Sequence, residues 1–331
     1  MAVPLSRRAV ISGLGAAALL GCRRDREPLR ADPATVAGAV AAPPPPAVPA
    51  AGPAATPAPE PIRRRIPSSG ELVPAIGIGS WQTFDVAPDE VATVQPVLTR
   101  FLALGGRVID SSPMYGRAEA AIGEMLAADP ATPTPFPATT VWTEGKRAGE
   151  REMRRSLARL GVSTLDLMQV HNLVDWQTQL ATMRAWKDAG TFRYLGVTHY
   201  QRAAFDELER IIRRERVDFV QLPYSVSDRS AERRLLPAAA DAGVAVLVMQ
   251  PFDSGALFDR VRGKPLPAVA AELACTSWAQ LFLKWLLGHP AVTCPIPATA
   301  KLHHLEDNMG ALHGPVPDEA QRAAIVAAVG A

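Results

Sequence analysis

The chain has 331 residues, of which 48% are hydrophobic and 21% are charged, the balance of a globular protein. Its 35 Lys and Arg nearly cancel its 33 Asp and Glu, and this net charge of +2 argues against a nucleic-acid partner. Three cysteines exclude a disulfide scaffold, and no apolar run has the ~20 residues of a membrane-spanning helix.

Residues 1–22 have the pattern of an export signal. Ser6-Arg7-Arg8 is a charged start that resembles a twin-arginine signal, and the apolar stretch after it, residues 9–20, has the length of a signal core. The segment Leu19-Leu20-Gly21-Cys22 resembles a bacterial lipoprotein box, in which the cysteine is lipidated. We therefore expect contact with the export machinery, a lipid anchor at Cys22 and a periplasmic location. The alternative is an ordinary cleaved signal with an incidental cysteine.

Residues 23–61 form a predicted disordered linker rich in Pro and Ala. Residues 28–61 hold 11 of the 31 prolines, including the run Pro43-Pro44-Pro45-Pro46, and they show no helical or strand period. Such a segment cannot bury enough apolar surface to offset its ordering entropy. We expect a polyproline-II-like spacer of at most ~100 Å, at ~3.1 Å per residue. A ligand for a proline-binding module is the alternative.

Residues 62–331 alternate short apolar runs with amphipathic stretches after a small hairpin, predicted over Arg63–Val73. The predicted strands are Ala75–Gly79, Arg107–Asp110, Thr139–Trp142, Leu165–Val170, Arg193–Val197, Phe219–Leu222, Ala245–Met249 and Val292–Pro295. The predicted helices are Asp89–Leu104, Ala118–Ala127, Glu150–Leu160, Trp176–Ala189, Ala203–Arg214, Ala231–Ala242, Thr276–Leu287 and Leu302–Ala311. Eight strand–helix units favour an α/β fold of the (β/α)8 TIM barrel type. The rival is a doubly wound sheet, but Gly77-Ile78-Gly79 lacks the third glycine of a dinucleotide fingerprint.

Polar residues follow several of the predicted strands, where a barrel places its active site. Each is weak by itself, because a lone histidine at a strand end is usually structural and Asp or Tyr near a turn usually serves the turn. Together they form a stronger signal. The motifs are GIGSW (77–81), VIDSSPMYGRAEAAIGE (108–124), LDLMQVHN (165–172), YLGVTH (194–199), VQLPY (220–224) and IPATAKLHHLEDN (296–308). In content and order they resemble the aldo-keto reductases across residues 62–331.

This resemblance implies NADP(H) as cofactor and the reversible reduction of an aldehyde or ketone, a small-molecule carbonyl substrate. By resemblance, Tyr115 donates the proton, His171 hydrogen-bonds the carbonyl oxygen, and Asp110 belongs to the charge network beneath Tyr115. The residues implied in cofactor binding are Ser80, Trp81, Gln82, Asn172, Thr198, Gln221, Thr299, Lys301, Asp307 and Asn308. No group of residues has the spacing of a metal site, so no metal is expected.

The chain departs from the family at a catalytic lysine near the end of the third strand, where Thr140 stands. Without that cation Tyr115 loses the neighbour that favours its ionised form, and a buried Asp110 loses its ion-pair partner. Lys146 and Arg147, expected in the following loop, either fold back into the site or remain solvated. We expect a slow or specialised reductase whose turnover rises on Thr140→Lys.

Further departures concern the cofactor. His199 stands where Asn is common, and Phe252 is an uncertain stacking partner for the nicotinamide. His304 occupies a common Arg position, which weakens the expected preference for NADPH over NADH. Cys275 and Cys294 either pair in an oxidising compartment or remain free.

Two functional hypotheses follow from this pattern. The first is an exported, membrane-tethered oxidoreductase. The second is a barrel that binds a nucleotide or small molecule but has lost hydride transfer, which the threonine at position 140 favours. Neither the substrate, which depends on loops such as residues 253–267, nor the oligomeric state is predicted.

Overall fold

The computed structural model describes residues 60–129 and 134–330. The predicted export signal over residues 1–22, the lipidation site Cys22 and almost all of the linker over residues 23–61 lie outside the described residues.

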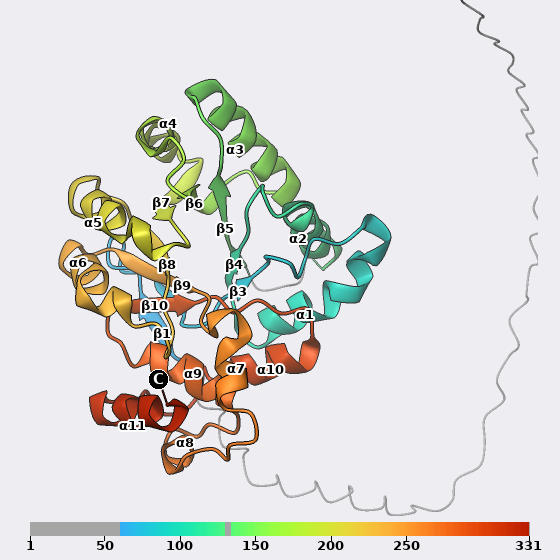
Figure 1. Ribbon diagram of the computed structural model, residues 1–331. Coiled ribbons are helices and arrows are strands. Elements are labelled where there is room, and N and C mark those ends of the chain that lie inside the picture. Colours follow the sequence, from blue (N-terminus) through green and yellow to red (C-terminus); the bar gives the residue numbers. More distant parts are fainter. Residues whose placement is uncertain (1–59, 130–133, 331) are drawn as a thin grey trace, which may run out of the picture. The chain divides into compact units, whose positions relative to one another are not determined.

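Eight parallel strands form the barrel, and they follow one another in sequence order around it (Figure 1). They are β3 (Ile78–Gly79), β4 (Val108–Asp110), β5 (Phe136–Val141), β6 (Leu165–His171), β7 (Phe192–Thr198), β8 (Phe219–Pro223), β9 (Ala245–Met249) and β10 (Val292–Pro295). The predicted strands are thus confirmed with small changes in their ends. The largest changes are at two strand starts, each by three residues: β3 begins at Ile78 rather than at Ala75, and β5 begins at Phe136 rather than at Thr139.

The barrel closes between β10 and β3 through individual backbone hydrogen bonds. The amide of Gly77 donates to the carbonyl of Pro295 at 3.0 Å, and that of Gly79 donates to Pro297 at 3.1 Å. A Cβ added to Gly77 would lie 2.8 Å from the carbonyl oxygen of Val108, closer than real contacts allow. The Gly-Ile-Gly segment therefore permits close strand packing. This closure confirms the barrel and rules out the doubly wound sheet.

Helices surround the strands on the outside (Figure 1). They are α1 (Val91–Ala103), α2 (Ala118–Ala128), α3 (Lys146–Leu160), α4 (Trp176–Asp188), α5 (Phe205–Arg214), α6 (Leu235–Ala242), α9 (Trp278–Leu287) and α10 (Leu302–Gly310). Three further helices, which we did not predict, are α7 (Ala256–Arg260), α8 (Ala268–Glu272) and α11 (Glu319–Val329). Short 3-10 turns precede some of these helices: η1 (Pro88–Glu90), η2 (Arg202–Ala204), η3 (Ser230–Arg233) and η4 (Asp253–Gly255).

The predicted N-terminal hairpin is present as β1 (Arg63–Arg65) paired antiparallel with β2 (Leu72–Pro74). Ile66 and Val73 are fully buried among inward-facing strand residues such as Val108 and Phe219. The hairpin therefore seals the end of the barrel at which the strands begin, because those residues lie in the first halves of their strands.

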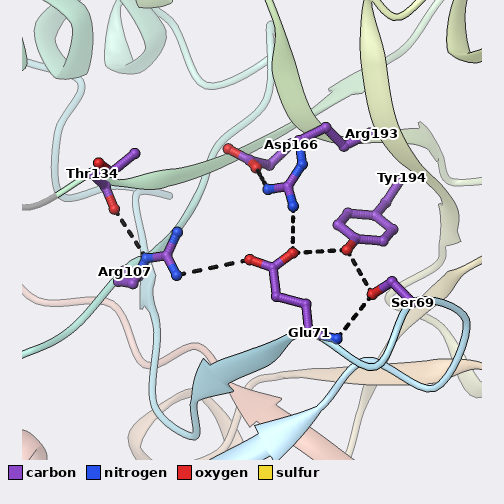
Figure 2. A network of polar contacts seen from close by, with 7 residues as sticks. All are labelled: Ser69, Glu71, Arg107, Thr134, Asp166, Arg193 and Tyr194. Atoms are coloured by element: carbon purple, nitrogen blue, oxygen red, sulfur yellow. Dashed lines mark hydrogen bonds and ion pairs between the residues drawn. The ribbon is translucent and has the colours of Figure 1, made fainter.

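A polar network fastens this hairpin to the barrel (Figure 2). Glu71 forms ion pairs with Arg107 and Arg193, and the hydroxyl of Tyr194 donates to its carboxylate at 2.8 Å. Arg193 also pairs with Asp166 of β6. The network thus joins the hairpin to three strands.

Cys275 and Cys294 are both buried and free, so the disulfide alternative is excluded. Burial raises the pKa of Cys275 to about 11. Among the helices of the described residues, none is both long and apolar enough to cross a membrane.

Candidate active site

The barrel interior is apolar near the start of its strands and polar near their ends. The strand register sets His171, Thr198 and Gln221 side by side on β6, β7 and β8, while Thr140 lies beside Gln169. All five side chains are buried. Side chains in register on neighbouring parallel strands share a face, so these residues line one end of the barrel.

Tyr115 and His171 come together at this end. Tyr115 lies in the loop after β4, and its ring meets the imidazole of His171 edge to face, with centroids 5.9 Å apart. The indole of Trp142, which follows β5, lies 6.3 Å from the same imidazole on centroids and is 43% exposed. Two of the three predicted catalytic side chains are thus in contact beside an exposed aromatic ring.

The loop that presents Tyr115 is positioned by the carboxylate of Asp85. The backbone amide of Arg117 donates to Asp85 at 2.8 Å. Gly116 has a φ of +60°, and a Cβ there would lie 2.2 Å from the same carboxylate. Only glycine suits both requirements, which explains the Tyr-Gly pair of the motif.

Asp110, the last residue of β4, is a buried carboxyl group that forms no ion pair. The amide of Gln169 donates to it at 3.3 Å, and the Gln221 amide faces it without completing a hydrogen bond. Burial raises the pKa of Asp110 to about 7, although both amides oppose this shift. The carboxyl group is therefore partly protonated near neutral pH.

The pKa of Tyr115 is raised above its usual value, first by burial and second by the charge of Asp110. No cation counters these effects among the groups that shift it. Lys146 and Arg147, predicted to lie in a loop, instead begin helix α3, and both are exposed. The expectation of a loop is wrong. Both side chains are solvated, which was the second of the two alternatives. Neither Lys146 nor Arg147 therefore replaces the missing lysine.

Thr140 takes part in a hydroxyl network that sequence reasoning missed. Its hydroxyl donates to the Oγ of Ser112 at 2.8 Å, and that atom lies 3.1 Å from Nδ1 of His171. Burial lowers the pKa of His171 to about 4, with a smaller contribution from His199. The imidazole is therefore neutral at physiological pH. Ser112 belongs to the motif over residues 108–124, but only the fold places its side chain between Thr140 and His171.

Strained backbone is concentrated at the same end of the barrel. Of the nine non-glycine residues with positive φ in the described chain, seven follow the ends of β3, β6 and β9. They are Gln82, Asn172, Leu173, Asp175, Gln250, Asp253 and Ser254. Such strain is typical of functional sites, where the surrounding structure over-determines the backbone.

The predicted nicotinamide contacts surround this region. Ser80 is buried and hydrogen-bonds Ser111 at 3.0 Å, whereas Trp81 is 50% exposed. Among the described residues, Asn172 Oδ1 and Gln221 Nε2 are buried without a hydrogen-bond partner. One is an acceptor and the other a donor, which together complement a carboxamide group. Phe252, the uncertain stacking residue, packs against Phe258 and Phe282, with ring centroids 5.0 and 6.4 Å away.

The predicted adenosine contacts lie just before α10, at Thr299 and Lys301, and in its second half, at Asp307 and Asn308. Thr299 accepts a hydrogen bond from the backbone amide of Lys301 at 3.0 Å. Asn308 is buried, while Asp307 accepts from Gln280 of α9 at 2.8 Å. The Asp307 carboxylate is thus already occupied in part. The imidazole rings of His303 and His304, neighbours on α10, have centroids 4.3 Å apart.

No group of three or more potential metal ligands occurs within residues 60–129 and 134–330.

Comparisons with known proteins agree with this architecture. An uncharacterized oxidoreductase of Schizosaccharomyces pombe, C215.11c, is 32% identical over 164 residues, which cover 49% of this chain and 51% of that protein. The chain thus spans about half the length of that relative. The uncharacterized oxidoreductase YtbE of Bacillus subtilis is 24% identical over 253 residues, covering 72% of this chain and 84% of that protein.

Solved structures share the fold. The aldo-keto reductase AKR11C1 from Bacillus halodurans superposes with a TM-score of 0.67 at 20% identity, covering 81% of this chain and 96% of its own. An aldo/keto reductase from Klebsiella pneumoniae, in complex with NADP and acetate, gives 0.64 at 25% identity, with coverage of 77% and 91%. The model of the aldo/keto reductase family matches residues 75–328, and the chain belongs to that family.

Proposed function

We propose that this protein is an NADP(H)-dependent oxidoreductase that reduces an aldehyde or ketone with Tyr115 as proton donor. The observation that supports this most is the convergence of Tyr115 and His171 beside the buried carboxyl group of Asp110. A carbonyl oxygen that gains a hydride becomes an alkoxide, which needs a proton and a hydrogen-bond donor. Tyr115 would supply the proton, and His171 would supply the hydrogen-bond donor.

The polar atoms around this centre fit the proposed cofactor. Bound NADPH would supply the hydride. Asn172 Oδ1 and Gln221 Nε2 would hold its carboxamide, because they are an unpartnered acceptor and donor. Thr299 and Lys301 would lie by its adenosine phosphate, at the start of a helix of nine residues. The Klebsiella relative at 25% identity was crystallised with NADP, which supports the same assignment.

The site is expected to turn over slowly. Tyr115 must give up its proton, and its raised pKa makes it a weaker acid than a tyrosine beside a lysine. The alternative function, a binding module without hydride transfer, has the same observation in its favour. The proposal also places the protein outside the cytoplasm, held by a lipid at Cys22, on the sequence of residues 1–22.

Cofactor binding is the first test. NADPH is titrated into the purified full chain and intrinsic Trp fluorescence is recorded, with NADH as comparison and Trp81→Phe as the matched control. Trp81 is half exposed beside the site, so its quenching on NADPH addition is the expected result. If neither nucleotide binds at millimolar concentration, the reductase proposal fails and the ligand-binding barrel replaces it.

Turnover separates the two functions once binding is shown. A panel of aldehydes is assayed with the wild type and with Tyr115→Phe, which keeps the ring and removes the hydroxyl. Losing a general acid costs about 10²- to 10⁴-fold, so we expect the variant to lose at least about 100-fold in kcat with unchanged NADPH affinity. Equal rates in the two proteins would favour the binding module.

A further inference from the structure

A chain of three hydrogen-bonding groups lies behind the proposed catalytic pair. Thr140 on β5 donates to the Oγ of Ser112 at 2.8 Å, and Ser112, which follows β4, lies 3.1 Å from Nδ1 of His171 at the end of β6. Thr140 is 2% exposed, Ser112 is fully buried and His171 is 7% exposed. Water therefore competes little with these contacts.

Counting donors and acceptors gives the direction of each bond. A serine hydroxyl has one proton and two acceptor sites. The Oγ of Ser112 accepts from Thr140 and also from the backbone amide of Met114 at 3.3 Å. Both acceptor sites are thus used, so the single proton of Ser112 has Nδ1 of His171 as its acceptor. A ring nitrogen that accepts a hydrogen bond has no proton of its own.

We propose that Ser112 and Thr140 are positioning residues whose hydroxyl chain holds His171 in the tautomer with its proton on Nε2. A neutral imidazole has one N–H, and this chain puts it on the nitrogen that points away from Ser112. The part of this inference in which that N–H donates to a substrate carbonyl rests on the proposed function. The tautomer itself is a property of the free protein.

The surroundings of His171 support a neutral ring. Burial lowers its pKa to about 4, and the side chain whose charge affects it is His199, which acts in the same direction. Tyr115 and Trp142 lie against the imidazole with centroids 5.9 and 6.3 Å away, and neither brings a charge. The Thr140 hydroxyl therefore acts on His171 through Ser112, whereas a lysine at this position would act on Tyr115.

The test measures the tautomer directly by NMR. The full chain, labelled with ¹⁵N-histidine and free of cofactor, is recorded near neutral pH, and His171→Gln assigns the resonance. The two ring nitrogens differ strongly in ¹⁵N shift according to which one is protonated. We expect an Nε2–H ring in the wild type and a mixture of tautomers in Ser112→Ala. An Nδ1–H ring in the wild type, or an unchanged tautomer in a folded Ser112→Ala, overturns the proposal.

Neighbouring hydroxyls provide matched variants. Thr140→Val should shift the Nδ1 resonance, because the Ser112 hydroxyl loses its donor, and Thr140→Ser should restore it. Thr139→Val is the control, since the Thr139 hydroxyl is equally buried but donates to Glu119 at 2.6 Å. A shift with Thr139→Val as large as that with Thr140→Val would show a general packing effect and contradict the relay.

Kinetics test what the tautomer is used for. With NADPH and an aldehyde, Ser112→Ala should lower kcat about 10-fold and change KM less than about twofold, part of the full effect of an acid–base group. A raised KM with an unchanged kcat would contradict a positioning role in the reaction. If the wild type reduces nothing, the proposed function fails while the NMR result still decides the tautomer. The two failures are therefore distinguishable.

Discussion

At the scale of single residues, the unusual feature is a buried carboxyl group without a cation. Asp110 is 4% exposed, and the side chains whose hydrogen bonding favours its charged form are the neutral amides of Gln221 and Gln169. A buried carboxylate without an ion pair is costly, so the group remains protonated to a higher pH than usual. This single difference alters the acidity of Tyr115 as well as the pH dependence of folding.

Replacing Asp110 by Asn should stabilise the protein at alkaline pH. The pKa of Asp110 is about 7 in the folded state, against 3.8 as the ordinary value. Between these values the folded state holds a proton that the unfolded state has lost, so wild-type stability falls as pH rises. An asparagine does not titrate. At about 1.36 kcal/mol per pKa unit, the advantage of Asp110→Asn should grow by about 2–3 kcal/mol from pH 5 to pH 8.

Urea unfolding of both proteins at several pH values measures this difference. Asp241→Asn, on an exposed carboxylate in α6, is the matched control and should show no such growth. A constant difference between wild type and Asp110→Asn would mean that Asp110 titrates at its ordinary pKa.

Thr140→Lys should raise turnover. A cation at this position would pair with Asp110 and lower the pKa of Tyr115, since an opposite charge within about 4–6 Å shifts a pKa by about 1–3 units. A more acidic donor speeds proton transfer to the alkoxide, and we expect kcat to rise about 10-fold. Thr139→Lys, on the opposite side of the strand, is the comparison. Unchanged turnover in a folded variant that still binds NADPH would mean that Tyr115 acidity does not limit the rate.

At the scale of elements, the two ends of the barrel have different tasks. The β1–β2 hairpin seals the end where strands begin. Its Glu71 pairs with Arg107, just before β4, and with Arg193 of β7, which in turn pairs with Asp166 of β6. The loops after β3, β6 and β9 hold the strained residues at the other end. Stability and chemistry are thus separated along the barrel axis.

Glu71→Gln should loosen the hairpin without affecting catalysis. The side chain of Glu71 is 22% exposed and contacts Arg107, Arg193 and Tyr194. Hydrogen bonds to charged groups contribute about 1.5–3 kcal/mol when buried and less when exposed, so we expect a loss of about 1–2 kcal/mol. Urea unfolding measures it, with Glu144→Gln on an exposed carboxylate as control. Equal effects in both variants, or a change in kcat, would contradict a purely structural role.

At the scale of the whole molecule, the barrel gathers residues that are far apart in the chain. Ser112, Thr140 and His171 come from three successive strand–helix units of the barrel. Outside the ring of strands, Arg322 of α11 contacts Trp285 and Tyr224. The Arg322 guanidinium lies 4.4 Å above the Trp285 ring and donates to Tyr224 at 2.7 Å. α11 is thereby fastened to α9 and to the loop after β8.

Cys22→Ser should release the protein from the membrane fraction. The residues before Cys22 resemble a lipoprotein box, and a lipid attached there would hold the barrel through the proline-rich linker. Fractionation of cells that express the wild type and the variant measures this, and the variant should appear in the soluble periplasmic fraction. Changing Arg7 and Arg8 together to Lys should keep the protein inside the cell. Equal membrane association of wild type and Cys22→Ser would exclude the anchor.

Much of the fold could be predicted because it depends on local patterns. Alternating apolar runs and amphipathic stretches gave all eight barrel strands, and the glycines at helix ends set boundaries such as that of α6 at Gly243, whose φ is +66°. The start of α3 was misplaced, since Lys146 and Arg147 are charged and exposed and show no apolar period there. Helix α11 was missed, although Asp318 and Gln321 form a capping box at its start.

The sequence by itself determined the barrel, the family and the absence of a lysine at position 140, because each depends on residue types and their order. Only the tertiary structure decided what stands in place of that lysine. Ser112 and Thr140 are 28 residues apart, and Ser112 and His171 are 59 apart, so no local pattern relates them. The ends of neighbouring parallel strands bring these side chains together, and burial then sets their protonation states.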